Sequence, residues 1–143
     1  MINPAEFLDK TASYTLQLPS NLESITTVEK LLDDLSREYR FDDELYADII
    51  TCMREVMTNA VVHGNKYSDD KSIHFNLELI EGKRLIVNIT DEGKGFDPND
   101  IPDPTSSVNL EKLSGRGVFL VKKLADQFIF NAKGNGIELH FIV

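Results

Sequence analysis

Three polar residues, Glu55, Asn59 and His63, recur four residues apart in a segment that is otherwise rich in apolar residues. Residues at this spacing lie one turn apart on an α-helix, so we expect the three side chains to form a stripe beside the core-facing stripe. A carboxylate can accept a proton, and an amide oxygen suits Mg²⁺, which prefers oxygen ligands. The same spacing also fits a solvated helix edge, with His63 at the end where the helix dipole favours a cation.

A second candidate begins at Asp91, which follows an apolar strand and opens the run DEGKG. Gly93 and Gly95 permit positive φ and let the main chain approach a ligand closely. The Asp91 carboxylate could then accept a hydrogen bond from an exocyclic amine. A glycine-rich turn in which Asp91 only ends the strand is an equally good interpretation of this segment alone.

The third candidate is the run SGRG at residues 114–117, which precedes an apolar stretch that begins at Val118. We expect a helix to begin there, so that its free N–H groups and the positive end of its dipole face an anion. Arg116 either pairs with a phosphate or points into solvent, and this segment favours neither.

Together the three segments resemble the motifs of the GHKL ATPase and kinase superfamily. Residues 55–64 (EVMTNAVVHG) resemble its N box, residues 91–96 (DEGKGF) its first glycine box, and residues 114–117 (SGRG) its second. The resemblance covers roughly residues 14–143. Within the superfamily, the chain is similar to the bacterial anti-sigma-factor serine/threonine kinases, which are single domains of this size.

The resemblance implies a site for ATP and Mg²⁺. It implies that Asn59 coordinates Mg²⁺, that Asp91 recognises the adenine amino group, and that Glu55 is the catalytic base for a substrate hydroxyl. One departure is Ile137, because the family often has threonine after the corresponding glycine, near the adenine-binding aspartate. The implied nucleotide-binding residues are Asn59, His63, Asp91, Gly93, Gly95, Gly115, Arg116, Gly117 and Val118.

The resemblance also implies protein partners. It implies an anti-sigma factor and ATP-dependent protein-serine kinase that phosphorylates a STAS-type anti-anti-sigma factor, regulates transcription by partner switching, and forms a homodimer. The alternative is a non-catalytic GHKL module that binds ATP or sequesters a partner without turnover. A sensor histidine kinase domain is least favoured, because residues 1–41 contain no His and offer only one helix.

The composition limits the other possibilities. A chain of 143 residues with 41% hydrophobic content is long enough for one domain with a core. Its 15 Lys and Arg against 24 Asp and Glu give a formal charge of -9, which disfavours direct binding to nucleic acid. No signal-peptide pattern or long apolar run occurs, so we expect a cytoplasmic protein without a membrane span. The single Cys52 lies in an apolar pattern and is expected to be a buried, reduced thiol.

Hydrophobic periodicity predicts the elements that carry these residues. Alternation predicts strands at residues 14–18, 72–80, 84–90, 128–131 and 137–143, with hairpin turns at 81–83 and 134–136. Spacings of three and four predict helices over residues 22–35 and 42–60, the second stopped by Gly64, and a short helix from Val118. Residues 93–117 are rich in glycine and proline and are expected to form a long loop.

This order of elements predicts the α+β class, with helices on one face of a sheet. The resemblance implies the Bergerat-type version of this two-layer α/β sandwich, which has a mixed, mostly antiparallel sheet and about three helices on one face. We therefore expect one GHKL-type domain over residues 14–143, preceded by an N-terminal extension at residues 1–13.

Overall fold

One sheet carries every strand of the computed structural model, which describes residues 11–94 and 115–143. All strand pairs among these residues are antiparallel. The strands lie in the spatial order β1 (Ala12–Pro19), β2 (Ser72–Ile80), β3 (Arg84–Thr90), β5 (Gly136–Ile142) and β4 (Gln127–Phe130).

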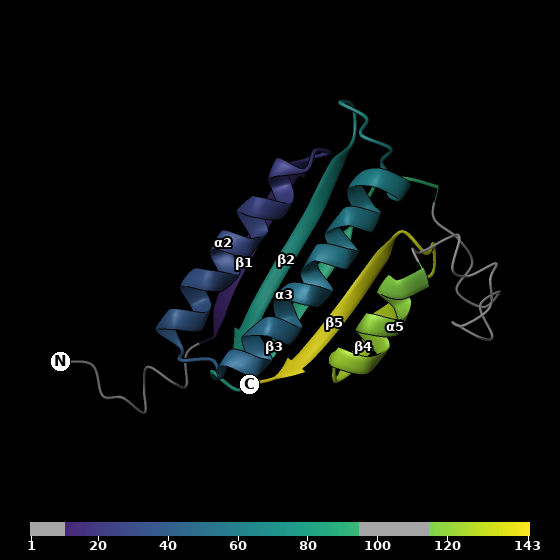
Figure 1. The fold of residues 1–143 in the computed structure, drawn as a ribbon. Helices are drawn as coiled ribbons and strands as arrows, with labels where there is room; N and C mark the ends of the chain where they lie inside the picture. Colours follow the sequence, from purple (N-terminus) through teal and green to yellow (C-terminus); the bar gives the residue numbers. More distant parts are fainter. Residues whose placement is uncertain (1–10, 95–114) are drawn as a thin grey trace.

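The helices form a second layer on one face of this sheet, as Figure 1 shows. They are α2 (Glu23–Glu38), α3 (Asp43–Thr58), which continues directly into the π-helical turn η1 (Asn59–Gly64), and α5 (Gly115–Leu124). The arrangement confirms the predicted α+β sandwich. No helix in the described part of the chain has the length and apolar character needed to cross a bilayer.

Strict alternation of buried side chains in β2 and β3 decides which face of the sheet meets the helices. In β2 the buried side chains are Ile73, Phe75, Leu77 and Leu79, whereas the residues between them face away from the helices. Antiparallel register continues this row through Val87 of β3 and Leu139 of β5. Burying each of these side chains contributes about 1.5–3 kcal/mol, so a slip of one residue in register would be costly. The helices add Val28, Leu32, Leu35, Ile49, Met53 and Met57 to the same core.

Local sequence sets one turn at each end of β2. β1 ends at Pro19, and the Ser24 N–H donates to Asn21 Oδ1 at 3.2 Å, which satisfies one of the free N–H groups at the start of α2. The β2–β3 turn places Glu81 and Gly82 at φ 54° and 65°, which matches the twist of a tight hairpin.

Two helices differ from the sequence expectations at one end. α5 begins at Gly115 rather than at Val118, because the glycines join the helix instead of preceding it. The helix that Gly64 stops is not α-helical to its end, since η1 follows α3. Gly95 and most of the predicted loop lie outside the described residues, and the division into an extension and a domain at residue 14 stays a prediction, although β1 begins at Ala12.

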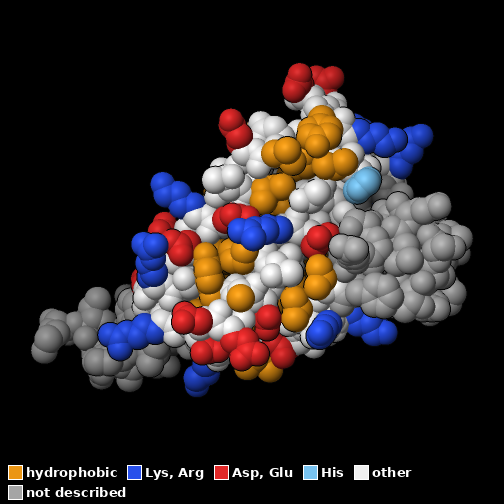
Figure 2. All heavy atoms as spheres, viewed as in Figure 1, with side chains coloured by type: hydrophobic (Ala, Val, Ile, Leu, Met, Phe, Trp, Pro, Cys, Tyr) orange, Lys and Arg blue, Asp and Glu red, His pale blue; other side chains and the backbone are white. Residues whose placement is uncertain are grey.

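The outer surface of the helix layer differs between its two ends. Figure 2 shows hydrophobic side chains gathered near the end where α2 begins and η1 ends, with a few acidic side chains at its tip, and a larger group of acidic side chains at the opposite end. Leu22 is 53% exposed and Tyr67 is 50% exposed. Leu22 precedes α2, and Tyr67 follows η1.

Candidate functional site

Asn59 is the first residue of η1 and has a buried acceptor without a partner. Its main-chain N–H donates to the carbonyl oxygens of Glu55 and Val56 one turn earlier. Its side-chain Oδ1 is buried, and no group among the described residues donates a hydrogen bond to it. Leaving such an acceptor unsatisfied costs about 1–3 kcal/mol, so the arrangement fits a ligand that this oxygen binds. An amide oxygen in this state suits a hard cation such as Mg²⁺.

The end of η1 meets the loop after β3 at two glycines. A Cβ added to Gly64 would overlap the Asp91 carboxylate, and a Cβ added to Gly93 would overlap the carbonyl oxygen of Gly64. Only glycine permits so close an approach of two backbones. The first and second predicted motifs are therefore in direct contact.

Asp91 occupies the centre of this contact. Its Oδ1 accepts a hydrogen bond from the Gly93 N–H at 2.8 Å. Burial raises the pKa of this carboxyl, and the Gly93 N–H and the more distant Lys133 and Lys71 offset part of that effect. The result is a half-buried acceptor with one oxygen already held by the main chain.

Comparison with known proteins decides the family. The sequence model of the family described as the histidine kinase-like ATPase domain matches residues 18–141. The chain belongs to this family. The match confirms the resemblance to the GHKL superfamily that the three motifs carry.

Relatives of this ATPase domain have regulatory names. The chain is 26% identical over 133 residues to an anti-sigma F factor of Clostridium botulinum, which covers 90% of this chain and 82% of that protein. It is 28% identical over 121 residues to the serine-protein kinase RsbW of Listeria monocytogenes, which covers 78% of this chain and 74% of the relative.

A solved structure supports the fold. It contains the RsbU and RsbW domains of a Mycobacterium tuberculosis protein and matches 92% of this chain with a TM-score of 0.62 at 16% identity. This chain spans 32% of that solved chain. At this identity the likeness concerns the fold alone.

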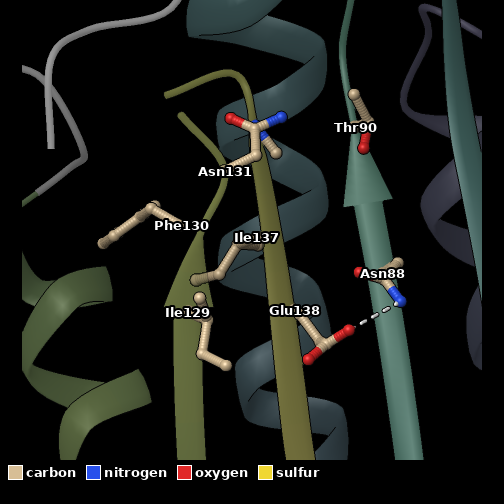
Figure 3. Close-up of a pocket in the computed structure, with 8 residues that line it drawn as sticks. Asn88, Thr90, Ile129, Phe130, Asn131, Ile137 and Glu138 are labelled. Carbon is tan, nitrogen blue, oxygen red and sulfur yellow. Dashed lines mark hydrogen bonds between the residues drawn. The ribbon is translucent and has the colours of Figure 1, made fainter. Parts of the chain in front are cut away.

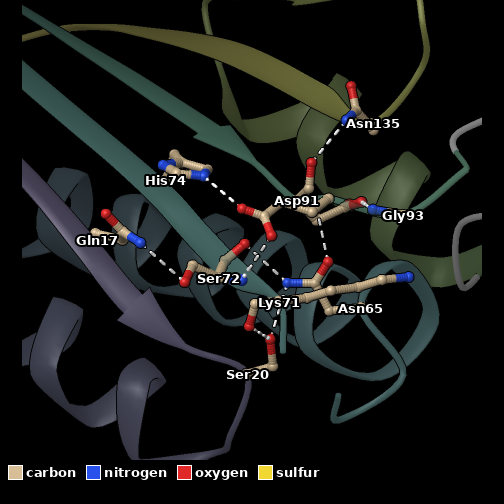
Figure 4. A network of polar contacts seen from close by, with 10 residues as sticks. Gln17, Ser20, Asn65, Lys71, Ser72, His74, Asp91, Gly93 and Asn135 are labelled. Atoms are coloured by element: carbon tan, nitrogen blue, oxygen red, sulfur yellow. Dashed lines mark hydrogen bonds and ion pairs between the residues drawn. The ribbon is translucent and has the colours of Figure 1, made fainter. Parts of the chain in front are cut away.

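Asn65 links three segments at the site (Figure 4). The sequence motifs of this histidine kinase-like ATPase domain did not identify it as a site residue. The residue is 1% exposed. Its Nδ2 donates to Ser20 Oγ and to the Ser72 carbonyl, each at 2.9 Å, and its Oδ1 accepts from the Glu92 N–H at 2.7 Å. The only sequence signal is a polar residue directly after the glycine that ends the helix.

The remaining predicted residues lie in several environments. Glu55 is half-buried in the last turn of α3, and His63 is exposed on η1. The π turn changes the angle per residue, so His63 does not continue the stripe of Glu55 and Asn59 as an α-helix would. Gly95 lies outside the described residues. The second glycine box, residues 114–117, leads into α5, which lies beside α3 in Figure 1, and the first turn of α5 comprises Gly115, Arg116, Gly117 and Val118.

A separate hollow of about 180 Å³ lies at the β4–β5 end of the sheet (Figure 3). None of the predicted site residues lines it. Pockets for drug-sized ligands usually measure about 300–1,000 Å³, so this hollow is small for a nucleotide. Its lining residues are Asn88, Thr90, Ile129, Phe130, Asn131, Gly136, Ile137 and Glu138.

Proposed function

We propose that this domain binds ATP with Mg²⁺ and phosphorylates a serine of a STAS-type anti-anti-sigma protein, and that it holds a sigma factor inactive in the alternative complex. The observation that carries the proposal is the buried Oδ1 of Asn59, which has no hydrogen-bond partner among the described residues, at the start of the helical turn whose end contacts Asp91. The names of the relatives supply the class of partner.

In this proposal Asn59 is the protein ligand of the cation. No group of three or more His, Cys, Asp or Glu side chains suited to a metal occurs in residues 11–94 and 115–143. This fits Mg²⁺, which commonly takes one or two protein ligands and completes its shell with water and phosphate oxygens. When bound, Mg²⁺ would neutralise charge on the phosphates.

The base and the phosphates are assigned to the other two motifs. Asp91 accepts a hydrogen bond from the adenine amino group, and Gly93 and Gly95 shape the pocket for the base. The residues assigned to the phosphates are His63, Gly115, Arg116, Gly117 and Val118, because the N-terminus of a helix offers free N–H groups to an anion.

Glu55 is proposed as the general base. It lies one turn before Asn59, and a base for the serine hydroxyl has to lie near the phosphates and the cation that Asn59 would bind. Glu55 takes the hydroxyl proton, the serine oxygen bonds to the γ-phosphorus, and ADP leaves with the bridging oxygen. The exposed Leu22 and Tyr67 lie at the same end of the helix layer and would support docking of a protein substrate. A cytoplasmic homodimer that regulates transcription without touching nucleic acid completes the proposal.

A non-catalytic ATP-binding or sequestering module is the second candidate. Ile137 favours it, because this side chain pairs with Ile89 across the sheet and packs on the core, where the related kinases often offer a hydroxyl. Weaker binding of the adenine base would allow nucleotide binding without efficient turnover.

Calorimetric titration with ATP, with and without Mg²⁺, tests the binding site. We expect Mg²⁺-dependent binding that Asn59→Ala removes, because the variant lacks the cation ligand. Asn76→Ala, on the exposed face of β2, is the matched control and should bind normally. No binding at millimolar ATP would exclude the ATP-dependent proposal.

Phosphotransfer to a STAS protein tests the kinase. Glu55→Ala should bind ATP with Mg²⁺ as the unmodified protein does and should transfer phosphate about 10²–10⁴-fold more slowly, the usual contribution of a general base. Phosphoserine formation is followed by mass spectrometry. Transfer at the normal rate would remove Glu55 from this role, and binding without any transfer in the unmodified protein would favour the second candidate.

A further inference from the structure

Two asparagines from different parts of the fold hold the main chain on either side of the Asp91 carboxylate. Asn135, in the β4–β5 turn, accepts from the Asp91 N–H with its carbonyl oxygen at 2.8 Å and donates from Nδ2 to the Asp91 carbonyl at 2.6 Å. Asn65 Oδ1 accepts from the Glu92 N–H, which belongs to the same peptide unit as the Asp91 carbonyl, at 2.7 Å. The main chain of Asn135 thus fixes the peptide unit before Asp91 Cα, and the side chains of Asn65 and Asn135 fix the unit after it.

The turn that carries Asn135 is itself held in one shape. Asn131 Oδ1 accepts from the N–H groups of Gly134, Asn135 and Gly136 at 2.7, 3.1 and 3.2 Å. Asn131 Nδ2 donates to Asn135 Oδ1 at 2.8 Å. Since Oδ1 of Asn135 is engaged in this way, its Nδ2 is directed to Asp91.

Asn65 is also fixed, at the cost of backbone strain. Its N–H donates to the Ala60 carbonyl at 2.8 Å and closes the π turn. The next two residues, Lys66 and Tyr67, have φ of 51° and 57°. Such left-handed residues cost of order 1–3 kcal/mol each and persist where the surroundings determine them. The hydrogen bonds of the Asn65 side chain help to hold the backbone of Lys66 and Tyr67 in this conformation.

We propose that Asn65 and Asn135 are positioning residues that set the preference of the site for adenine over other bases. The inference rests on the proposed function, in which Asp91 accepts from the adenine amino group. A buried acceptor discriminates between donors and acceptors only where its position is held, because a shift lets water or another orientation satisfy it. The two asparagines act through Asp91 and do not touch the base.

Inosine triphosphate is the probe, because it carries a carbonyl oxygen where ATP carries the amino group. Affinity for ATP and for inosine triphosphate is measured with Mg²⁺ in the unmodified full chain and in Asn65→Ala, Asn135→Ala and Asn76→Ala. A hydrogen bond to a charged group gives about a 10- to 100-fold preference for ATP. We expect the preference to fall about tenfold or more in Asn65→Ala and Asn135→Ala and to persist in Asn76→Ala.

Two features separate positioning from general damage to the fold. Loss of folding would lower affinity for both nucleotides together, whereas loss of positioning lowers the ratio of the two affinities. Asn65→Asp keeps an acceptor for the Glu92 N–H and removes the donors to Ser20 and Ser72, so it should retain more of the preference than Asn65→Ala. Melting temperatures are recorded for every variant. If Asn65→Ala does not fold, Asn135→Ala, in an accessible turn, carries the test.

The outcomes are distinct. If the unmodified protein prefers ATP and the preference survives in both alanine variants, or falls equally in Asn76→Ala, the inference is wrong and the proposed function stands. If the unmodified protein binds neither nucleotide, or binds both equally, the role of Asp91 fails and the inference fails with it.

Discussion

The Asp91 carboxylate is held at a cost to stability. Burial raises its pKa, so at neutral pH the folded state keeps an ionised group less solvated than in the unfolded chain. The destabilisation is full above the raised pKa and vanishes below the ordinary carboxyl pKa of about 3.9, where both states are protonated. We therefore predict that Asp91→Asn raises the melting temperature at pH 7 by a few degrees and weakens ATP binding.

Thermal unfolding of both proteins between pH 3 and pH 8 checks this sign. The difference in melting temperature should shrink steadily as pH falls. Asn88→Ala provides a polar control in β3, the strand that precedes Asp91. The only hydrogen bond described for the Asn88 side chain is a long one of 3.4 Å to Glu138. A variant that is less stable than the parent at pH 7 would show that Asp91 stabilises the fold instead.

The sequence predicted the three motifs but not the residues whose hydrogen bonds hold them in place. Asn59, Asp91 and Gly93 stand out because three segments in this order together resemble the GHKL motifs, whereas each segment alone also fits a solvated helix edge or an ordinary turn. Asn65 and Asn135 carry no comparable signal, because an amide that bonds main-chain groups of distant segments is recognisable only once those segments meet. Short polar residues near turns are common, and the sequence alone does not show whether such a residue only forms a turn or also bonds a distant segment of the main chain.

At the scale of elements, periodicity was sufficient where one face is buried. The hairpin of β2 and β3 was predicted to the residue, because alternation and the Glu81–Lys83 turn point to the same register. The π turn was not predicted, since apolar residues continue through Ala60 and Val61 as they would in an α-helix. The π turn ends with Gly64 against Asp91, a tertiary contact that the local periodicity does not indicate.

The contact between η1 and the loop after β3 predicts a strict need for glycine. In Gly64→Ala the new methyl group would overlap the Asp91 carboxylate, so we expect a loss of about 1–3 kcal/mol in unfolding free energy and a displaced Asp91. Chemical denaturation and ATP titration measure the two effects. Gly82→Ala is the control, because φ of 65° makes it destabilising in a turn remote from the site. Equal ATP affinity in Gly64→Ala and the parent would contradict the contact.

For the whole molecule, Cys52 offers a probe of how nucleotide binding and global stability are linked. The side chain is fully buried in α3, as the sequence predicted, and burial, with a smaller contribution from Asp48, raises the pKa of its thiol to about 12. A thiol reagent needs an exposed thiolate. Because α3 packs on the sheet between α2 and α5, exposure of Cys52 requires opening of the core, which also dismantles the Asn59 site that follows it.

We therefore predict that ATP with Mg²⁺ protects Cys52 from labelling without touching it. A ligand present at 100 times its Kd lowers the open population about 100-fold, so the rate of reaction with a thiol reagent at pH 8 should fall by about the same factor when reclosing is fast. Asn59→Ala should label at a rate that ATP does not change. Rapid labelling of the parent in native buffer, equally fast with and without nucleotide, would mean that α3 opens independently of the site, and the link between core and site would be lost.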